Sequence, residues 1–93
     1  MIRRLADPET ECIWNRERSR KLPPDIQQRA VRRLTPLDAA LSLDELAAMK
    51  GDRLHPLKDD RAGQHAIAIN MQWPICFVWK DGDAYDVEIT DYH

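Results

Sequence analysis

The apolar residues of this chain change their spacing at Gly51, and this change constrains the fold more than any other feature. Before Gly51, apolar side chains recur at helical spacing, for example at Ile26, Ala30 and Leu34. After Gly51, short apolar or alternating runs of strand length follow one another between turn residues. Helices followed by antiparallel strands predict an α+β domain, in which two N-terminal helices pack on a small antiparallel β-sheet.

The first helix is expected to begin at Asp7-Pro8. Asp7 offers an N-cap, and proline is favoured at the first helical position because its missing N–H would be unsatisfied there in any case. We expect this helix to continue to Leu22, where Pro23-Pro24 would end it. Residues 2–5 alternate between apolar and basic side chains, which is compatible with an edge strand.

A second helix is predicted from Pro24 onward, because apolar residues then follow a helical period. Pro36 conflicts with this helix, since a proline inside a helix costs about 3 kcal/mol. We therefore expect a break or kink near residues 33–35. The helical hairpin would span about residues 8–41, and Ser42 would cap a further turn.

The strands are expected in the second half of one 93-residue domain, within an antiparallel sheet of about residues 52–90. Asp81-Gly82 is a strong signal for a hairpin between the last two strands. A polar C-terminal tail would follow at residues 91–93. The expected strands are residues 53–57, 65–70, 74–79 and 84–89.

The length and charge of the chain limit its function. A chain of 93 residues forms one small domain, and without an apolar stretch of membrane-spanning length the expected location is the cytoplasm. Residues 1–33 contain nine basic and five acidic residues, a net charge of +4, whereas residues 34–93 contain five and eleven, a net charge of −6. This asymmetry is compatible with one face for RNA and another for a partner protein, and equally with ordinary solvated helix faces.

Two groups of residues could perform proton transfer on a phosphate. Asp91-Tyr92-His93 follow the last expected strand directly, and Arg53 to Lys58 combine His55 with two cations. A histidine can move a proton while a lysine or arginine stabilises phosphate charge. Taken singly, each group is also compatible with a solvent contact, because terminal and surface polar residues often have no other role.

Other kinds of site have no counterpart in the sequence. Cys12 and Cys76 are isolated, so neither a paired zinc motif nor a disulfide framework is indicated. The chain also contains no glycine-rich phosphate loop and no nucleophile elbow. Metal-dependent hydrolysis is therefore not expected.

In their order and spacing, these segments resemble the HigB-type toxins of the RelE superfamily, the killer proteins of type II toxin-antitoxin systems. The resemblance extends over nearly the whole chain. The segments that carry it are Ile13-Trp14, residues 20–27, Leu37 to Ala40, Asp52 to Lys58, Gly63 to His65, Ile69-Asn70, Gln72-Trp73, Ile75 to Trp79 and Asp91-Tyr92-His93.

The resemblance implies a RelE-like microbial RNase fold that enters the ribosomal A site and cleaves mRNA there, which inhibits translation. It implies metal-independent chemistry without a cofactor. His55, Asp91 and His93 would be the candidates for proton transfer, and Tyr92 would position the nucleotide or its 2′-hydroxyl. Lys58 and Arg53 would contact phosphate. Which of these residues is the general base stays open.

One position departs from the pattern of the family. The family usually has arginine after Asn-x-x-Trp, as a phosphate-binding side chain, and this chain has Pro74. A proline carries no charge and donates no hydrogen bond. By analogy with the loss of an oxyanion-hole donor, this would cost about 3 to 4 kcal/mol, or roughly 10² to 10³ in rate. We therefore expect an attenuated toxin, and Pro74 could be an inactivating substitution and not the natural residue.

The partners implied by the resemblance are the ribosome with its mRNA and a cognate HigA-like antitoxin with a helix-turn-helix motif. Operator DNA would be contacted only through that antitoxin, and no membrane partner is implied. Pro74 favours an alternative, in which the chain is a catalytically inactive binding partner or co-repressor of its antitoxin. A third possibility, a ribonuclease that acts on free RNA, is disfavoured by the overall negative charge of −2.

Overall fold

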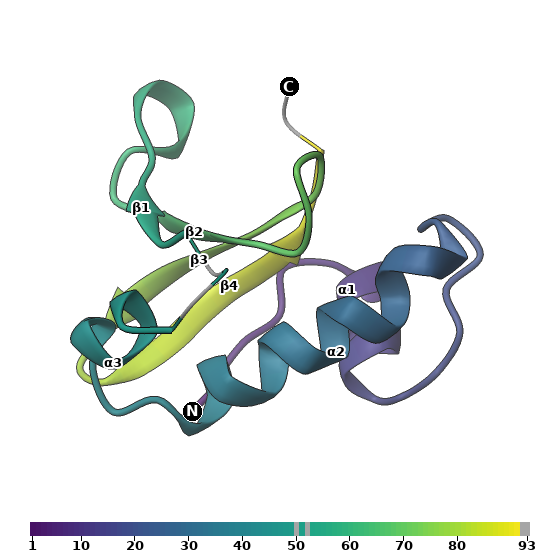
Figure 1. Cartoon of the computed structure of the whole chain (residues 1–93), viewed down its shortest axis with the longest axis horizontal. Helices are drawn as coiled ribbons and strands as arrows, with labels where there is room; N and C mark the ends of the chain where they lie inside the picture. Colours follow the sequence, from purple (N-terminus) through teal and green to yellow (C-terminus); the bar gives the residue numbers. More distant parts are fainter. Residues whose placement is uncertain (50, 52, 92–93) are drawn as a thin grey trace.

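The computed structural model describes residues 1–49, 51 and 53–91, and has an α+β fold of two layers (Figure 1). The first layer contains helices α1 (Pro8–Trp14), α2 (Pro24–Ala39) and α3 (Leu43–Ala47). The second is an antiparallel sheet of strands β1 (His55–Pro56), β2 (His65–Ala68), β3 (Pro74–Lys80) and β4 (Asp83–Ile89), in the order β1-β2-β3-β4.

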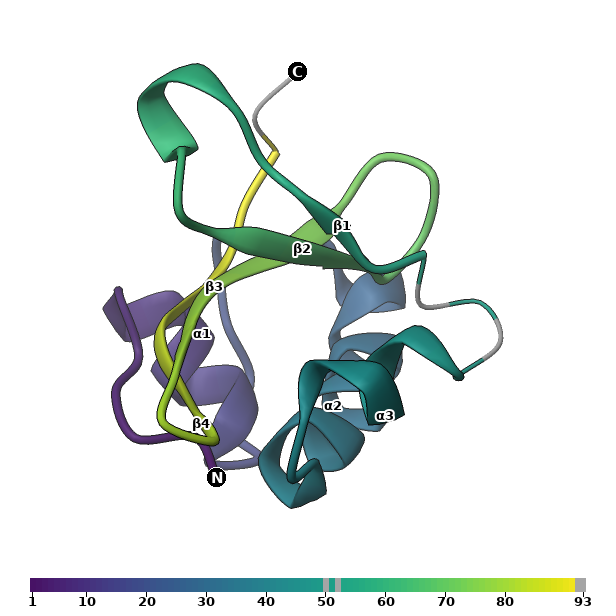
Figure 2. The same cartoon turned by 90° about the vertical axis from the view of Figure 1, so that its left-hand side faces the viewer.

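One face of the sheet is covered by the helices, and the opposite face is here called the open face. Figures 1 and 2 show that the connection between β1 and β2, with the short helix η1 (Asp59–Arg61), rises on the open side, as does the described segment after β4, residues 90–91. None of the helices described has the length and apolar character needed to cross a membrane.

Helix α1 begins as predicted but ends eight residues earlier than expected. The side chain of Asp7 accepts a 2.7 Å hydrogen bond from the Thr10 N–H, which is the expected N-cap. The helix ends at Trp14, and Arg16 adopts a left-handed conformation with φ 64°. The prediction that α1 continues to Leu22 was wrong because the charged residues after Trp14 offer no apolar stripe to bury.

The segment between α1 and α2 is instead held by side-chain hydrogen bonds. Gln27 accepts a hydrogen bond from the Ser19 N–H at 3.1 Å, and its amide donates to the carbonyls of Ser19 at 3.0 Å and Leu22 at 2.8 Å. These bonds satisfy backbone groups that a helix would otherwise pair. Ser19 and Leu22 are both buried, so the irregular segment packs onto the helical layer.

Helix α2 continues through Pro36, so of the predicted break or kink near residues 33–35 the break is excluded. Leu34 and Leu37 are fully buried on either side of the proline. Burying two leucine side chains contributes about 1.5–3 kcal/mol each, which offsets the roughly 3 kcal/mol cost of a proline in a helix. The hydroxyl of Thr35 donates to the Val31 carbonyl at 2.9 Å, one turn before the proline.

The register of the sheet decides which side chains occupy the open face. In the pairing of β2 with β3, Ala66 lies opposite Cys76 and Ala68 opposite Pro74. Ile75 and Phe77, which alternate with these residues on β3, belong to the core beneath the helices. Pro74 and Cys76 therefore lie on the open face.

Two local predictions at the ends of elements are confirmed. The Ser42 hydroxyl accepts a 3.3 Å hydrogen bond from the Glu45 N–H at the start of α3. Asp81 and Gly82 both have positive φ, at 52° and 82°, in the tight turn between β3 and β4. Gly82 adopts this conformation without strain because it lacks a Cβ atom.

Residues 2–5 lie beside β4 but form two isolated parallel bridges in place of an edge strand. Ile2 pairs with Ala84 and Leu5 with Val87. The side chain of Asp83 forms ion pairs with the N-terminal amine at 3.2 Å and with Arg3 Nε at 3.1 Å. These two cations lower the pKa of Asp83, with the hydrogen bond from Arg3 as the largest cause. The N-terminus is thus fixed along the edge of the sheet.

Candidate functional site

The strand register brings His55 and position 74 onto the same face of the sheet. His55 pairs with Ala66, Ala66 with Cys76, and Cys76 with Glu88. Paired residues on neighbouring strands share a face, so this row crosses the open face from β1 to β4. Pro74 lies on that face two residues from Cys76. The floor between His55 and Pro74 consists of the small side chains Ala66 and Ala68.

Pro74 is buried at the first position of β3. Its carbonyl accepts a 3.3 Å hydrogen bond from the Thr90 N–H, while the preceding carbonyl of Trp73 accepts one of 2.9 Å from Ile69. A proline is tolerated at the first residue of a strand. A longer side chain at this position would project over the open face on the side of His55, and Pro74 places no charge there.

His55 is exposed, and its ring is oriented by the backbone of the same segment. Its Nδ1 atom lies 2.8 Å from the carbonyl oxygen of Arg53. The backbone of Arg53 has φ 51°, and its guanidinium donates to the Met71 sulfur at 3.2 Å. Arg53 therefore reaches from the start of β1 to the loop between β2 and β3.

The loop between β2 and β3, residues 69–73, joins β1 to the end of the chain. Asn70 Oδ1 accepts hydrogen bonds from the N–H groups of Gln72 at 2.9 Å and Trp73 at 2.8 Å, which fixes the turn. The side-chain amide of Gln72 donates to Asp91 Oδ2 at 3.0 Å. The predicted residues Arg53 and Asp91 thus meet the same loop.

Lys58 lies in the connection between β1 and η1. It precedes η1 and is exposed, in a stretch from Leu57 to Arg61 that lines a cavity of about 340 Å³. Asp59 and Asp60 line the same cavity, so the positive charge of Lys58 lies among acids. Tyr92 and His93 lie outside the described residues.

Arg61, Glu88 and Gln64 were not identified from the sequence as site residues. Arg61 donates to Glu88 at 3.0 Å and to Gln64 at 3.1 Å, which connects η1 to β4 across the open face. Glu88 lies opposite Cys76, whose pKa burial raises to about 11. No sequence signal could have indicated this contact, because it joins residues 27 positions apart and depends on the sheet register.

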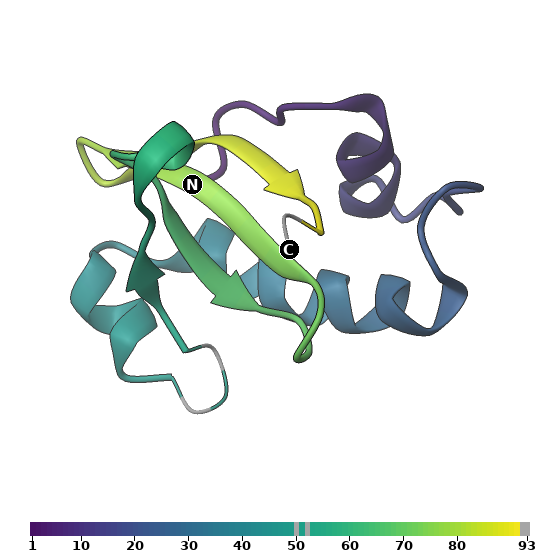
Figure 3. The ribbon, with the colours of Figure 1, turned by 90° about the horizontal axis from the view of Figure 1, so that it is seen from above.

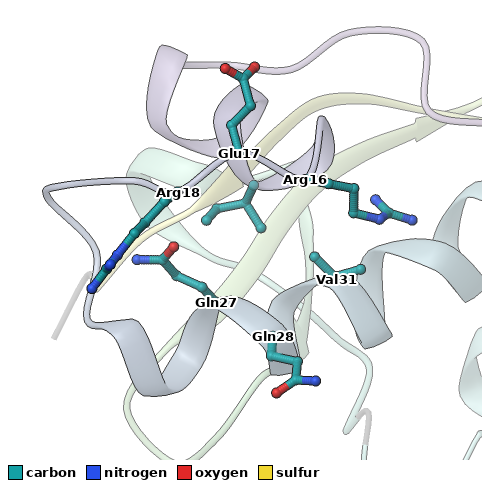
Figure 4. A pocket seen from close by; sticks show the side chains of 7 residues that line it. Arg16, Glu17, Arg18, Gln27, Gln28 and Val31 are labelled. Atoms are coloured by element: carbon teal, nitrogen blue, oxygen red, sulfur yellow. The ribbon is translucent and has the colours of Figure 1, made fainter.

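A separate cavity of about 340 Å³ lies between the end of α1 and α2 (Figure 4). Ile13 and Val31 form its apolar part, and the polar side chains of Arg16, Arg18 and Gln27 surround them. It contains none of the predicted site residues. Within the described residues there is also no group of three or more histidine, cysteine or acidic side chains placed to hold a metal ion.

Comparison with known proteins gives consistent results for sequence and structure. A family model described as the RelE-like toxin of type II toxin-antitoxin system HigB matches residues 7–93. The endoribonuclease HigB of Proteus vulgaris is 31% identical over 93 residues, which cover all of both chains. The toxin HigB-1 of Vibrio cholerae is 34% identical over 76 residues, 82% of this chain and 80% of that one.

The similarity of this chain to a solved structure concerns the fold alone. The crystal structure of a mutant of YafQ from E. coli aligns with a TM-score of 0.60, at 9% sequence identity. The alignment covers 99% of this chain and 94% of that one. The predicted α+β class, with helices on a small antiparallel sheet, is therefore confirmed.

Proposed function

Since the chain belongs to the RelE-like HigB toxins of type II toxin-antitoxin systems, we propose that it is an endoribonuclease that cleaves mRNA in the ribosomal A site. The name of its relative from Proteus vulgaris supports the endoribonuclease activity. Cleavage of mRNA on the ribosome would inhibit translation, which is the toxic effect.

The observation that supports the proposal is the register that puts His55 and position 74 on one face of the sheet, with Asp91 bonded to the loop between β2 and β3. Three strand spacings separate β1 from β4, about 14 Å along the sheet. A ribose with its phosphate can occupy such a space, so groups on both sides could act on one nucleotide. Of the residues between them, Ala68 is partly exposed, whereas Ala66 is buried beneath other atoms of the chain.

The proposed reaction uses only groups of the protein and of the RNA. The ribose 2′-oxygen attacks the adjacent phosphorus while a base of the protein accepts its proton. The bond to the 5′-oxygen of the next nucleotide then breaks, and an acid of the protein protonates that oxygen. The products are a 2′,3′-cyclic phosphate and a 5′-hydroxyl. His55, Asp91 and His93 are the candidates for the two proton transfers.

Charge stabilisation is the weak part of this site. Negative charge develops on the phosphate during the reaction, and cations nearby lower its energy. Arg53 and Lys58 are the proposed phosphate contacts, and Tyr92 would position the nucleotide. Position 74 supplies no charge in this chain, so we propose that cleavage is attenuated by Pro74.

As a member of a toxin-antitoxin family, the chain has an antitoxin as its partner. We propose that this antitoxin is HigA-like, with a helix-turn-helix motif, and that it alone contacts operator DNA. Because its proposed substrate is mRNA on the ribosome, the chain would act in the cytoplasm.

The second candidate function is a catalytically inactive partner or co-repressor of the antitoxin. Pro74 favours it, because a buried proline stands where the resemblance to the family implies a phosphate-binding arginine. In this case the fold would persist for antitoxin binding while cleavage is lost.

Primer extension on mRNA distinguishes these functions. The mRNA would be incubated with the chain or its Pro74→Arg variant, with and without ribosomes, in the presence of EDTA. We expect cleavage by Pro74→Arg only with ribosomes, unaffected by EDTA, and lost when His55→Ala or His93→Ala is added. Cleavage by neither protein would favour the second candidate function, a catalytically inactive partner of the antitoxin. Cleavage without ribosomes would indicate a ribonuclease that acts on free RNA.

A further inference from the structure

We propose that Arg29 and Arg32 of α2 bind a phosphate group of RNA in a cavity beside the loop of residues 69–73. The proposal rests on the proposed ribonuclease function and extends its RNA site. Arg29, Arg32 and Arg33 line this cavity of about 340 Å³ together with Ile69. The cavity contains three positive charges and, among the described residues that line it, no acidic side chain.

The spacing of the arginines is unfavourable for the helix itself. Positions 29, 32 and 33 are three and four residues apart, so their side chains share one side of α2. Like charges at this spacing destabilise a helix by about 0.2–0.5 kcal/mol per pair. An anion bound between Arg29 and Arg32 would reduce the repulsion between these two side chains.

Two of the three guanidinium groups are available to such an anion. Arg29 and Arg32 are exposed, and within the described part of the chain no carboxylate forms an ion pair with either. Guanidinium groups bind phosphate oxygens through two parallel hydrogen bonds. A pair of arginines beside the apolar wall of Ile69 is therefore suited to a phosphodiester.

Arg33 forms the side of the cavity next to the segment that leads into β1. A Cβ atom added at Gly51 would lie 2.9 Å from Arg33 Nη2, so that guanidinium packs close to the backbone there. Gly51 itself has φ 86°, a conformation that glycine adopts without strain. The segment continues to Arg53 and His55, which belong to the candidate site.

The chain itself connects the cavity to the candidate site through the loop of residues 69–73. Ile69 lines the cavity. In the same loop, the sulfur of Met71 accepts a hydrogen bond from Arg53, and the side-chain amide of Gln72 donates one to Asp91. Figure 3 shows this loop passing over α2. An RNA strand on the open face could therefore cross the loop and place a neighbouring phosphate between the arginines. This connection favours RNA over an acidic segment of the antitoxin.

Two RNA molecules could supply the phosphate: the mRNA strand that is cut, or ribosomal RNA next to it. Their backbone chemistry is the same, so the binding experiment needs both probes. One is a single-stranded 12-nucleotide 2′-O-methyl RNA, which cannot be cleaved because its 2′-oxygen is blocked. The other is the ribosome programmed with mRNA.

The test compares the full-length chain with Arg29→Ala/Arg32→Ala at several salt concentrations. Loss of two contacts to a single strand should lower the slope of log affinity against log salt by about 1.4, and weaken binding about 25-fold at 0.1 M salt. Arg29→Lys/Arg32→Lys should retain most of the affinity because it keeps both charges. The matched control is Arg18→Ala/Arg20→Ala, which removes two exposed charges outside this cavity.

The expected result is a selective loss for Arg29→Ala/Arg32→Ala with an unchanged Tm, and the affected probe identifies the source of the phosphate. An equal loss in the control would indicate diffuse charge attraction and overturn the proposal. So would unchanged binding to both probes, or a loss only in binding of the antitoxin. Cleavage by Pro74→Arg is measured separately, so failure of the arginine cavity is distinguishable from failure of the ribonuclease function.

Discussion

The side-chain amide of Gln72 donates a 3.0 Å hydrogen bond to the carboxylate of Asp91. This bond joins the loop between β2 and β3 to the segment that leads into the proposed catalytic tail. Asn70 fixes the same loop through two backbone hydrogen bonds, so Gln72 is presented from a rigid turn. Gln72 is therefore a positioning residue for Asp91 in the proposed reaction.

Gln72→Ala should reduce cleavage without changing stability. In the Pro74→Arg background we expect kcat/KM to fall about 13-fold, the equivalent of ~1.5 kcal/mol for a hydrogen bond to a charged group. An unchanged kcat/KM, or a lower Tm, would assign Gln72 a structural role only.

Pro74→Arg should increase mRNA cleavage by roughly 10² to 10³, which corresponds to about 3 to 4 kcal/mol of transition-state stabilisation. The physical reason is the position of residue 74 on the open face with His55, where an arginine could contact the scissile phosphate. Pro74→Gln is the control, since it removes the proline without adding charge. Equal gains from both variants would show that backbone relief, and not charge, limits the reaction.

Thr10→Val should lower the free energy of unfolding by about 1–3 kcal/mol. Thr10 is fully buried, and its hydroxyl oxygen accepts a 3.0 Å hydrogen bond from the Ile89 N–H at the end of β4. Valine has nearly the same shape but leaves that N–H without an acceptor. Thr35→Val is the matched control in an exposed position, with an expected change within about 0.5 kcal/mol. Urea denaturation measures the free energy of unfolding of both variants. Similar changes in the two would contradict the role of Thr10.

The Cys76 thiol should resist alkylation in the folded protein. It is buried, and burial raises its pKa to about 11, whereas Cys12 is only half-buried. Iodoacetamide at pH 8 should therefore modify Cys12 first, and both residues should react alike in denaturant.

The raised pKa of Cys76 means that the folded state retains a proton which the unfolded state loses. The associated stability is present below pH 9.0 and lost as the pH rises through about 11. Cys76→Ala should lack this loss.

Asp83→Asn should destabilise the protein at neutral pH but not in acid. The pKa of Asp83 is lowered by Arg3 and by the N-terminal amine, so its ionised form stabilises the folded state. That contribution is present above the ordinary value of 3.8 and is lost as the pH falls through the lower folded value. Thermal unfolding of both proteins across this range is the measurement. A constant difference in Tm would contradict the assignment.

Short-range signals in the sequence determined where several elements begin and turn. Asp7-Pro8 set the start of α1, Ser42 capped α3, and Asp81-Gly82 formed the tight turn between β3 and β4. The order of helices and strands also determined the α+β class. These features follow from backbone preferences of neighbouring residues, which act without the rest of the fold.

The tertiary structure decided which helices ended and which side chains met. Trp14 ends α1 because the following residues have no apolar face to bury, and α2 continues through Pro36 because Leu34 and Leu37 are buried against the sheet. The contacts of Arg61 with Glu88 and of Gln72 with Asp91 depend on the strand register. Burial and register are long-range properties whose free energies exceed local propensities, so only the folded chain determines them.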